Sequence, residues 1–323
     1  MQVDWWIAVA GLIVGTTVGL TGMGGGALMT PILVLLFKVN PATAVSSDVV
    51  ASLVMKPIGG GVHLRKGTVH RSMVGWLCVG SIPSAFAGVL LLRALGGDRV
   101  AERMKLILGI VLLVAALAMV AKARLVRRTD TVPVDDVRDV PVKVLPTVLI
   151  GVLGGLVVGM TSVGSGSLMI VLLLFLYPRL RAGQMVGTDL VQAVPLVASA
   201  TLGHLLFGEV QLALTGSLLI GAVPGVYLGA RTSARAPDKV LRTALIIVLS
   251  LSALKLLGLP NGALLGALVA GLLATGGVYL AGRRSASVTP AEPPGGGSGV
   301  AEVQRGGAEV LEEPVLQLPG KPG

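Results

Sequence analysis

The sequence predicts an all-α integral membrane protein: a polytopic helical bundle of about ten or eleven transmembrane segments in two inverted-topology repeats. Three observations lead to this fold class. The composition is too apolar for a soluble domain, apolar segments of membrane-spanning length follow one another, and residues of the first half recur in the second. Hydrophobic residues make up 53% of the chain and charged residues only 13%, which excludes an ordinary soluble domain.

Most of the apolar segments have the length of about 20 residues that a membrane-crossing helix requires. Segments 25–37 and 165–177 are shorter, about 13 residues each, and we expect them to be half-helices or to extend past the glycines before them. The full series of segments is 5–22, 25–37, 45–62, 72–93, 103–121, 145–162, 165–177, 184–206, 210–229, 240–257 and 261–281.

An internal repeat relates the two halves of the chain. Each copy contains an odd number of segments, so the second copy enters the membrane from the side opposite to the first, and the repeats are inverted. The recurring residues are Gly15, Gly19, Thr21, Gly24, Gly26, Leu28, Met29, Asp48, His63, Gly80 and Pro83 in the first copy, and Gly155, Gly159, Thr161, Gly164, Gly166, Leu168, Met169, Asp189, His204, Gly221 and Pro224 in the second.

The repeat also sets the expected organisation of the chain. Residues 1–125 form the first transmembrane repeat, 126–144 a cytoplasmic linker loop, 145–258 the second repeat, 259–282 an extra C-terminal transmembrane helix and 283–323 a disordered cytoplasmic tail. Lys and Arg gather in the linker and in the loops on its side of the membrane. We expect the protein to lie in a bacterial inner membrane. By the positive-inside rule, its N-terminus is outside the cell membrane and its C-terminus is in the cytoplasm.

Several classes of function are excluded by what the sequence lacks. The net charge of +10 lies in short loops between apolar segments, so we expect no nucleic-acid partner. The one cysteine, Cys78, cannot form an intrachain disulfide or a cysteine cluster. No nucleotide-binding or metal-binding motif is present. We therefore expect a protein that is not an enzyme and has no cofactor or metal, with the lipid bilayer and a small solute as partners. A homo-oligomer stays open.

Two glycine-rich breaks, 21–26 and 161–167, are the predicted substrate site. Each glycine costs a helix roughly 1 kcal/mol relative to alanine, and backbone opened within a membrane must line a cavity or be buried in protein. Freed N–H groups suit an anion, although small residues also allow close helix packing. The substrate-binding residues predicted here are Thr21, Gly24, Gly25, Gly26, Thr161, Gly164, Ser165 and Gly166.

The run from Gly15 to Pro31, its weaker second copy and the histidine and glycine positions that follow resemble the TauE/SafE sulfite exporter family over about residues 7 to 258. Its members are membrane transporters linked to sulfite, thiosulfate, sulfoacetate and other small sulfur compounds. The resemblance therefore implies a secondary transporter of a sulfur-containing anion, such as one of these or another organosulfonate. Inverted repeats imply alternating access.

The two breaks are not identical, and we expect their half-sites to differ. Where the first copy has Gly22, Gly25 and Pro31, the second has Ser162, Ser165 and Val171. The resemblance fixes neither the substrate nor the direction of transport, and a zwitterion such as taurine would use the same groups.

Charged residues inside the apolar segments complete the candidate site. A lysine within a membrane is costly, so Lys56 either faces the anion or snorkels or neutralises a nearby carboxylate. The repeated Asp48 and Asp189 either cap helices or take part in coupling or gating by accepting a proton or binding an ion. The repeated His63 and His204 either titrate in coupling or gating or form structural hydrogen bonds.

Three other classes of function remain as alternatives. A passive channel would share the fold, but its transport would not depend on a proton or ion gradient. A transporter for another small solute is a further alternative. Ser165 with His204 could form the nucleophile and base of an intramembrane serine hydrolase. A scaffold that does not transport is disfavoured by the polar residues within the repeats.

Overall fold

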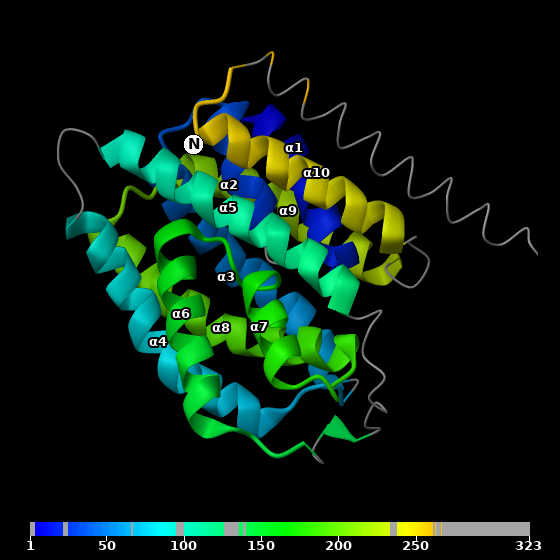
Figure 1. Cartoon of the computed structure of the whole chain (residues 1–323). Helices are drawn as coiled ribbons and strands as arrows, with labels where there is room; N and C mark the ends of the chain where they lie inside the picture. The colour runs from blue at the N-terminus through cyan, green and yellow to red at the C-terminus, as the bar shows by residue number, and fades with distance from the viewer. Residues whose placement is uncertain are drawn as a thin grey trace, which may run out of the picture. The chain divides into compact units, whose positions relative to one another are not determined.

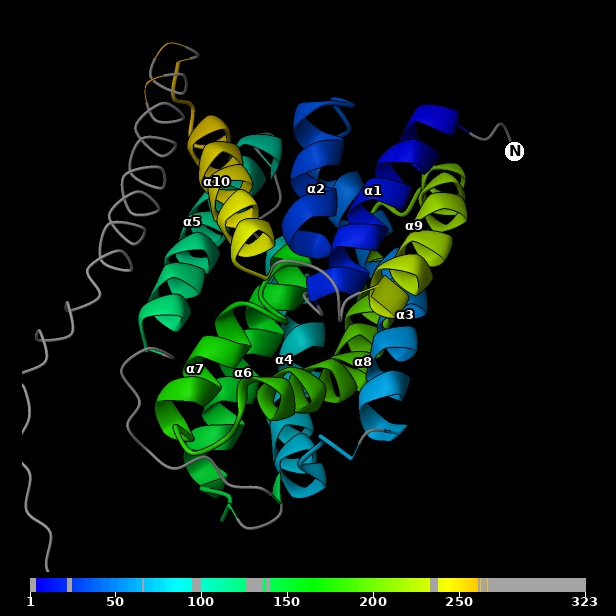
Figure 2. The same cartoon turned by 90° about the vertical axis from the view of Figure 1, so that its right-hand side faces the viewer.

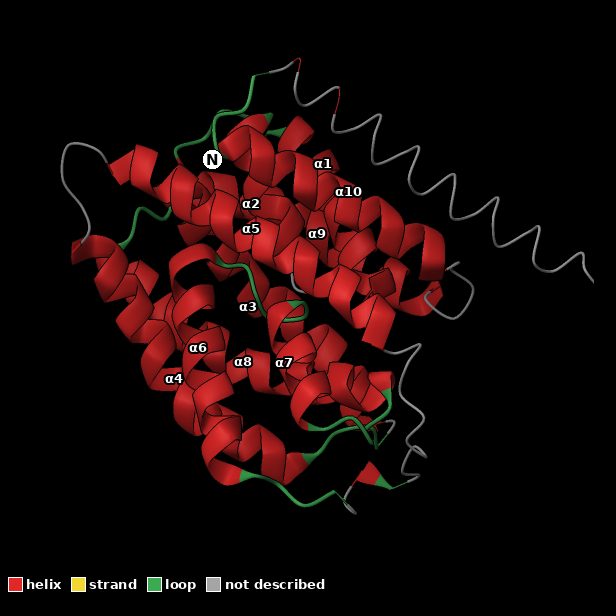
Figure 3. Cartoon of the chain, viewed as in Figure 1, coloured by secondary structure: helices red, strands yellow, loops and turns green. Residues whose placement is uncertain are grey.

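The computed structural model describes residues 4–21, 25–65, 67–94, 100–125, 136–137, 140–232, 238–260, 262 and 266. Helices and loops account for this part of the chain, which contains no strand (Figure 3). The helices, in order, are α1 Trp5–Thr21, α2 Gly26–Leu35, α3 Pro41–Arg65, α4 Arg71–Ala94, α5 Val100–Leu125, α6 Val144–Thr161, α7 Leu168–Leu176, α8 Ala182–Phe207, α9 Leu212–Thr232 and α10 Asp238–Leu256 (Figure 1).

The predicted all-α membrane fold is confirmed. Each of the first ten predicted segments corresponds to one described helix. Five helices are long and apolar enough to cross a membrane, namely Arg71–Ala94, Ala101–Ala121, Val144–Thr161, Gly183–Phe207 and Leu212–Gly229. The eleventh predicted segment, the tail and most of the linker lie outside the described residues. All described residues belong to one compact unit, Met1–Gly277.

The two short segments form short helices, as the half-helix interpretation expects. Helix α2 has 10 residues and α7 has 9. At 1.5 Å per residue, helices of this size are roughly 15 Å long, about half of a ~30 Å hydrocarbon core. Both follow a glycine-rich break and bury most of their apolar side chains. Each break therefore ends inside the protein, where it can be reached by groups from other helices.

Helices from opposite halves pack closely through glycine. Helix α1 lies along α9, and α4 lies along α6 (Figure 2). A methyl group on Gly15 would collide with the backbone of Ala222, and one on Gly155 would collide with the backbone of Ser81. Glycine is required at these positions because the two backbones approach without room for a Cβ atom.

These contacts occur twice in equivalent positions. Gly15 and Ala222 are the repeat counterparts of Gly155 and Ser81, and both pairs make the same backbone contact. Likewise, Gly221 meets the backbone of Ala8 on the α1–α9 side, and Gly80 meets the backbone of Val148, the counterpart of Ala8, on the α4–α6 side. The duplication seen in the sequence thus reappears as duplicated packing. The inversion of the repeats relative to a membrane stays a prediction.

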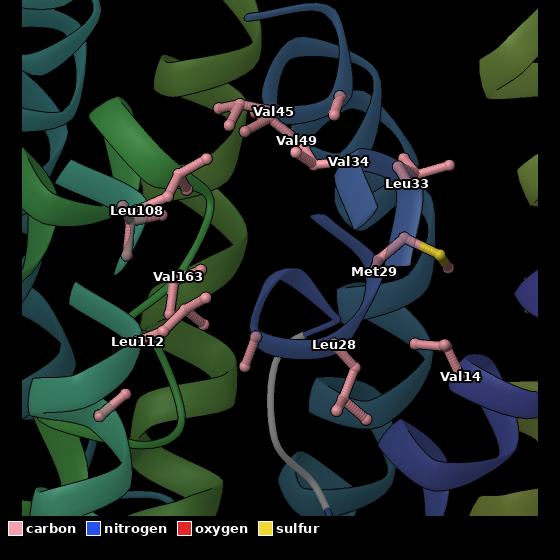
Figure 4. Close-up of a cluster of buried hydrophobic side chains, with 14 of the residues drawn as sticks. Val14, Leu28, Met29, Leu33, Val34, Val45, Val49, Leu108, Leu112 and Val163 are labelled. Carbon is pink, nitrogen blue, oxygen red and sulfur yellow. The ribbon is translucent and has the colours of Figure 1, made fainter. Parts of the chain in front are cut away.

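The main hydrophobic core surrounds the breaks. Leu28 and Met29 of α2, Leu112 of α5 and Val163 of the second break belong to one buried cluster (Figure 4). Met29 and Leu112 are completely buried, and Val163 is nearly so. Side chains from both halves therefore belong to the one buried cluster that includes residues next to both breaks.

Candidate functional site

One face of α3 carries the central polar residues. Asp48, Ser52 and Lys56 follow one another at intervals of four residues, which places them on the same side of a helix. All three are buried, with exposed fractions of 0%, 1% and 6%. Burying polar and charged groups is costly unless they are paired, so this face requires partners from other elements.

The helix bounds contradict the capping interpretation of the two aspartates. Helix α3 begins at Pro41, where the side chain of Asn40 accepts a hydrogen bond from the amide of Ala42. Asp48 therefore lies two turns inside the helix. Helix α8 begins after a capping box formed by other residues, and Asp189 is likewise internal and buried. Both carboxylates lie too far inside their helices to cap them.

Lys56 links the first half to the second break. Its Nζ atom donates a 2.7 Å hydrogen bond to the hydroxyl of Ser165. It also interacts electrostatically with the carboxylates of Asp48 and Asp189. Because the side chain is 6% exposed, it does not snorkel to the surface. The ammonium group thus stands among two carboxylates and a hydroxyl in the interior of the protein.

Asp48 joins α3 to both breaks. Its Oδ2 atom accepts a 3.0 Å hydrogen bond from Thr30 of α2, and the hydroxyl of Ser162 also interacts with the carboxylate. The breaks themselves touch: a methyl group on Gly26 would overlap the carbonyl of Ser162. Five of the predicted site residues therefore lie close together: Gly25, Gly26, Asp48, Lys56 and Ser165.

Two polar atoms at this meeting point lack hydrogen-bond partners. Among the described residues, neither Oδ1 of Asp48 nor Oγ of Ser52 has a partner with hydrogen-bond geometry. Both atoms lie 3.9 Å from the position that a Cβ atom on Gly25 would occupy. Unpartnered buried polar atoms are rare in proteins. The methyl group of Met55 lies nearer still, 2.9 Å from the same Cβ position, so these polar atoms lie beside an apolar side chain at the first break.

The backbone of the second break has positive φ angles that residues other than glycine rarely adopt. Gly164 and Gly166 have φ angles of 125° and 89°, and Ser162 ends α6 in the left-handed region with a φ of 60°. Glycine avoids the steric cost of these angles. The carbonyl of Gly164 then accepts hydrogen bonds from the amides of Leu168 and Met169. The break is a fixed turn that presents Ser165 to Lys56.

The two predicted threonine ligands bond their own backbone. The hydroxyl of Thr161 donates to the carbonyl of Val157 at 2.6 Å and accepts the amide of Val163 at 3.2 Å. The hydroxyl of Thr21 donates to the carbonyl of Thr17 at 2.7 Å. These threonines stabilise the ends of α1 and α6. Gly24, a further predicted ligand, lies outside the described residues.

The paired histidines make structural hydrogen bonds. His204 bonds the hydroxyl of Ser46 and the carbonyl of Gly159, each at 2.9 Å. His63 bonds the hydroxyl of Thr68 at 3.0 Å. The hydroxyl of Ser165, the partner of His204 in the hydrolase alternative, accepts its hydrogen bond from Lys56.

Sequence reasoning missed Thr30, Ser52 and His70. Ser52 could have been found, because it lies midway between Asp48 and Lys56 at helical spacing. Thr30 reaches Asp48 only through tertiary packing, so no local pattern marks it. His70 accepts the amide of Met73 at the start of α4 and bonds the carbonyl of Val140, which is a structural role.

Known proteins are similar to the chain over both halves. A family model described as "Sulfite exporter TauE/SafE" matches residues 7–256. "Probable membrane transporter protein YjnA" of Bacillus subtilis (strain 168) is 37% identical over 258 residues, which cover 78% of this chain and 98% of that protein. "Probable membrane transporter protein YdhB" of the same organism is 23% identical over 252 residues, covering 76% and 96%. No solved structure matches significantly.

Proposed function

We propose, on the ground that this chain belongs to the TauE/SafE sulfite exporter family of membrane transporters, that it is a secondary transporter of a small sulfur-containing anion. Sulfite, thiosulfate, sulfoacetate and other organosulfonates are the candidate substrates. The substrate would bind between the two breaks, where α2 and α3 of the first half meet the α6–α7 connection of the second. It would cross the membrane by alternating access.

The observation that carries this proposal is the hydrogen bond between Lys56 and Ser165. Oxygens of a sulfonate or thiosulfate only accept hydrogen bonds at neutral pH, so a site for them requires donors. An ammonium group offers three donors and a hydroxyl one. Lys56 and Ser165 supply both kinds of donor at a buried point. In a low-dielectric interior, such charge-assisted bonds are stronger than neutral ones.

The contact between the two breaks supports alternating access. The proposed substrate site and the contact between Gly26 and Ser162 both lie where α2 and α3 meet the α6–α7 connection. Movement at this meeting place would separate Lys56 from Ser165 and open the site. The glycine contacts of α1 with α9 and of α4 with α6 favour helix pairs as the moving bodies. We therefore propose that these mixed pairs, rather than intact repeats, rock against each other.

We also propose a bacterial inner membrane as the location, with the N-terminus outside and the C-terminus in the cytoplasm. The basic loops support this orientation. Lys38, at the end of α2, and Arg65, at the end of α3, would then lie on opposite sides of the membrane. The inverted repeats would likewise place equivalent loops of the two halves on opposite sides.

Exchange in proteoliposomes tests the proposed function. Vesicles loaded with unlabelled sulfite, thiosulfate or sulfoacetate would be diluted into the same radiolabelled anion. A carrier exchanges label faster when the inside holds substrate, whereas a channel shows no such acceleration. We expect accelerated exchange of at least one anion and its loss in Lys56→Met. The matched control is Lys105→Met, which removes an exposed lysine of α5. The sulfur-anion proposal is wrong if folded protein exchanges none of the three.

A further inference from the structure

Helices α3 and α8 are tied together at both of their ends. The two helices pack against each other and run in opposite directions. Ser46, near the start of α3, bonds His204, near the end of α8. At the other end of the pair, Gly187 of α8 lies against the ring of His63. The loop that follows each helix also folds back onto the start of the other helix, so hydrogen bonds hold both ends of the pair.

The first set of these bonds lies where α3 begins. The amides of Glu209 and Gln211, in the loop after α8, donate to the hydroxyls of Ser46 and Ser47, each at 3.3 Å. The ring of His204 bonds the hydroxyl of Ser46 at 2.9 Å. Both serines are buried, whereas Glu209 and Gln211 are exposed. We call these five residues the α3-start clasp.

The second set lies where α8 begins. The amide of His70, in the loop after α3, donates a 3.0 Å hydrogen bond to the hydroxyl of Thr188. The ring of His63 bonds the hydroxyl of Thr68 at 3.0 Å. A methyl group on Gly187 would lie 2.8 Å from that hydroxyl, so α8 and the loop are in close contact. We call these five residues the α8-start clasp.

The two clasps contain the same bond in equivalent positions of the repeat. Ser47 is the counterpart of Thr188, and Gln211 is the counterpart of His70, at the same offset along the chain. In each clasp, the backbone amide of the loop residue donates to the buried hydroxyl of the helix. The repeat therefore places one copy of this bond at each end of the α3–α8 pair.

The proposed substrate site lies between the clasps. Along α3, Lys56 follows Ser47 by nine residues, which corresponds to roughly 14 Å at 1.5 Å per residue. Further along α3, Gly60 lies against the backbone of Leu190. Thr188 is therefore nearer to the end of α3 than Lys56 is. An anion bound beside Lys56 would have one clasp on each side of it along this pair of helices.

Each clasp is also directly connected to the site. Asp48 follows Ser47, and Asp189 follows Thr188. Both carboxylates interact electrostatically with Lys56. A movement that breaks either hydroxyl–amide bond would therefore move a carboxylate that acts on Lys56, because one peptide bond separates the two residues. This connection provides a physical link between the ends of the helices and the substrate.

The clasps also join the mixed helix pairs to α3 and α8. Gln211 directly precedes α9, which packs against α1, and His70 directly precedes α4, which packs against α6. Release of the α3-start clasp would free the start of α9 from α3, and release of the α8-start clasp would free the start of α4 from α8. Each clasp thus holds one of the bodies that alternating access has to move.

We propose that the two clasps are the two gates of the transporter. The α3-start clasp closes the route between the site and the outside, the α8-start clasp closes the route between the site and the cytoplasm, and the two open in turn. The inference depends on the proposed alternating access and orientation, and it adds the gates to them. Water can take the place of either hydroxyl–amide bond when a gate opens, which keeps the cost of opening small.

The labelling rate of a cysteine between the clasps measures which gate opens, and this measurement needs no substrate. Ser52 is 1% exposed and lies on α3 between Ser47 and Lys56, so Ser52→Cys serves as the probe in a Cys78→Ser background. A membrane-impermeant maleimide is added to right-side-out or inside-out vesicles. We expect Ser47→Ala to raise the labelling rate from the outside by about fivefold, as loss of one typical hydrogen bond changes an equilibrium constant.

Thr188→Val should produce the opposite change, with faster labelling from the cytoplasmic side by a similar factor. Ser199→Ala is a control, because its hydroxyl bonds the carbonyl of Ile82. Thr232→Val is the matched control for the threonine, because its hydroxyl bonds its own helix. Faster labelling from the same side in Ser47→Ala and Thr188→Val, or no change in either, would contradict the gating role. A failure to transport sulfur anions does not alter this measurement, so the two proposals are tested separately.

A cross-link tests whether the α3-start clasp has to open during transport. The hydroxyl of Thr43 donates a 3.1 Å hydrogen bond to the carboxylate of Glu209. Thr43→Cys and Glu209→Cys, combined in the Cys78→Ser background, are joined by a short cleavable thiol cross-linker. We expect the exchange of radiolabelled thiosulfate to stop on cross-linking and to return on cleavage, and each single variant to be unaffected. Exchange that continues at an unchanged rate through a completed cross-link would overturn the gate.

Discussion

The Nζ atom of Lys56 donates a 2.7 Å hydrogen bond to the hydroxyl of Ser165, and this bond joins α3 of the first half to the break between α6 and α7 of the second. The repeat counterpart of Lys56 is Val197, and that of Ser165 is Gly25. The contact therefore has no equivalent on the other side of the repeat. Among the described residues, Lys56 is thus the one buried lysine or arginine, and it has no counterpart in the other repeat.

Replacing Lys56 with methionine should lower stability as well as transport. The change leaves Asp48 and Asp189 buried without their common counter-charge, and breaking a buried pair in this way costs about 3–5 kcal/mol. Thermal unfolding in detergent, followed by size-exclusion chromatography, measures the effect. Lys56→Met combined with Asp189→Asn should recover part of the lost stability but not transport. Equal stability of wild type and Lys56→Met would show that the two carboxylates do not depend on this lysine.

Ser165→Ala should weaken substrate binding while the protein still folds. The variant removes the hydrogen-bond acceptor of Lys56 and one donor to the anion, and a hydrogen bond to a charged group contributes about 1.5–3 kcal/mol. The KM for anion uptake should rise by roughly tenfold or more, since 1.4 kcal/mol corresponds to tenfold. Ser199→Ala is the control, because its hydroxyl donates to the carbonyl of Ile82 instead. An unchanged KM in Ser165→Ala would remove this serine from the site.

Gly26→Ala should disrupt the contact between the breaks. The added methyl group would overlap the carbonyl and hydroxyl of Ser162, and the α2 backbone would have to move. We expect loss of transport and a lower unfolding temperature. Gly61→Ala in α3 is the matched control, because its methyl group would meet no atom within 4 Å. This control should be tolerated or should stabilise α3 by about 0.5–1 kcal/mol. If both variants behave alike, the contact has no special role.

Inverted repeats predict that equivalent loops lie on opposite sides of the membrane. In a Cys78→Ser background, Lys38→Cys and Arg179→Cys, which lies in the equivalent loop of the second half, can each be treated with a membrane-impermeant maleimide. Intact cells should label Lys38→Cys, and Arg179→Cys should react only after permeabilisation. Arg65→Cys should also require permeabilisation. Labelling of Lys38→Cys and Arg179→Cys from the same side would contradict the inversion.

The helices and the breaks could be predicted from the sequence because their signals are local. The lengths of the apolar segments predicted α1 to α10, and the paired glycine clusters predicted where α2 and α7 begin. Lys56 and Ser165 were both singled out, but their contact could not be, since it joins positions far apart in the chain. The helix starts were misplaced: Asp48 followed polar residues that imitate a cap, whereas α3 begins two turns earlier at Pro41.

Side-chain roles were less predictable than positions. The hydroxyls of Thr21 and Thr161 were expected to face the substrate, yet each bonds a backbone carbonyl of its own helix. Threonine inside an apolar helix commonly does this, and no sequence pattern separates the two uses. Tertiary packing brings the hydroxyl of Ser46 and the carbonyl of Gly159 to the ring of His204, whereas the ring of His63 bonds Thr68, five residues further along the chain.

Equilibrium binding of radiolabelled thiosulfate to the purified protein tests the central claim most directly, because it measures the site around Lys56 without depending on coupling or direction. We predict saturable binding to wild type and to Lys105→Met, competition by sulfite and sulfoacetate, and no binding to Lys56→Met or to its more stable double variant with Asp189→Asn. Equal binding by wild type and these Lys56 variants would contradict the claim that the anion binds between the two breaks.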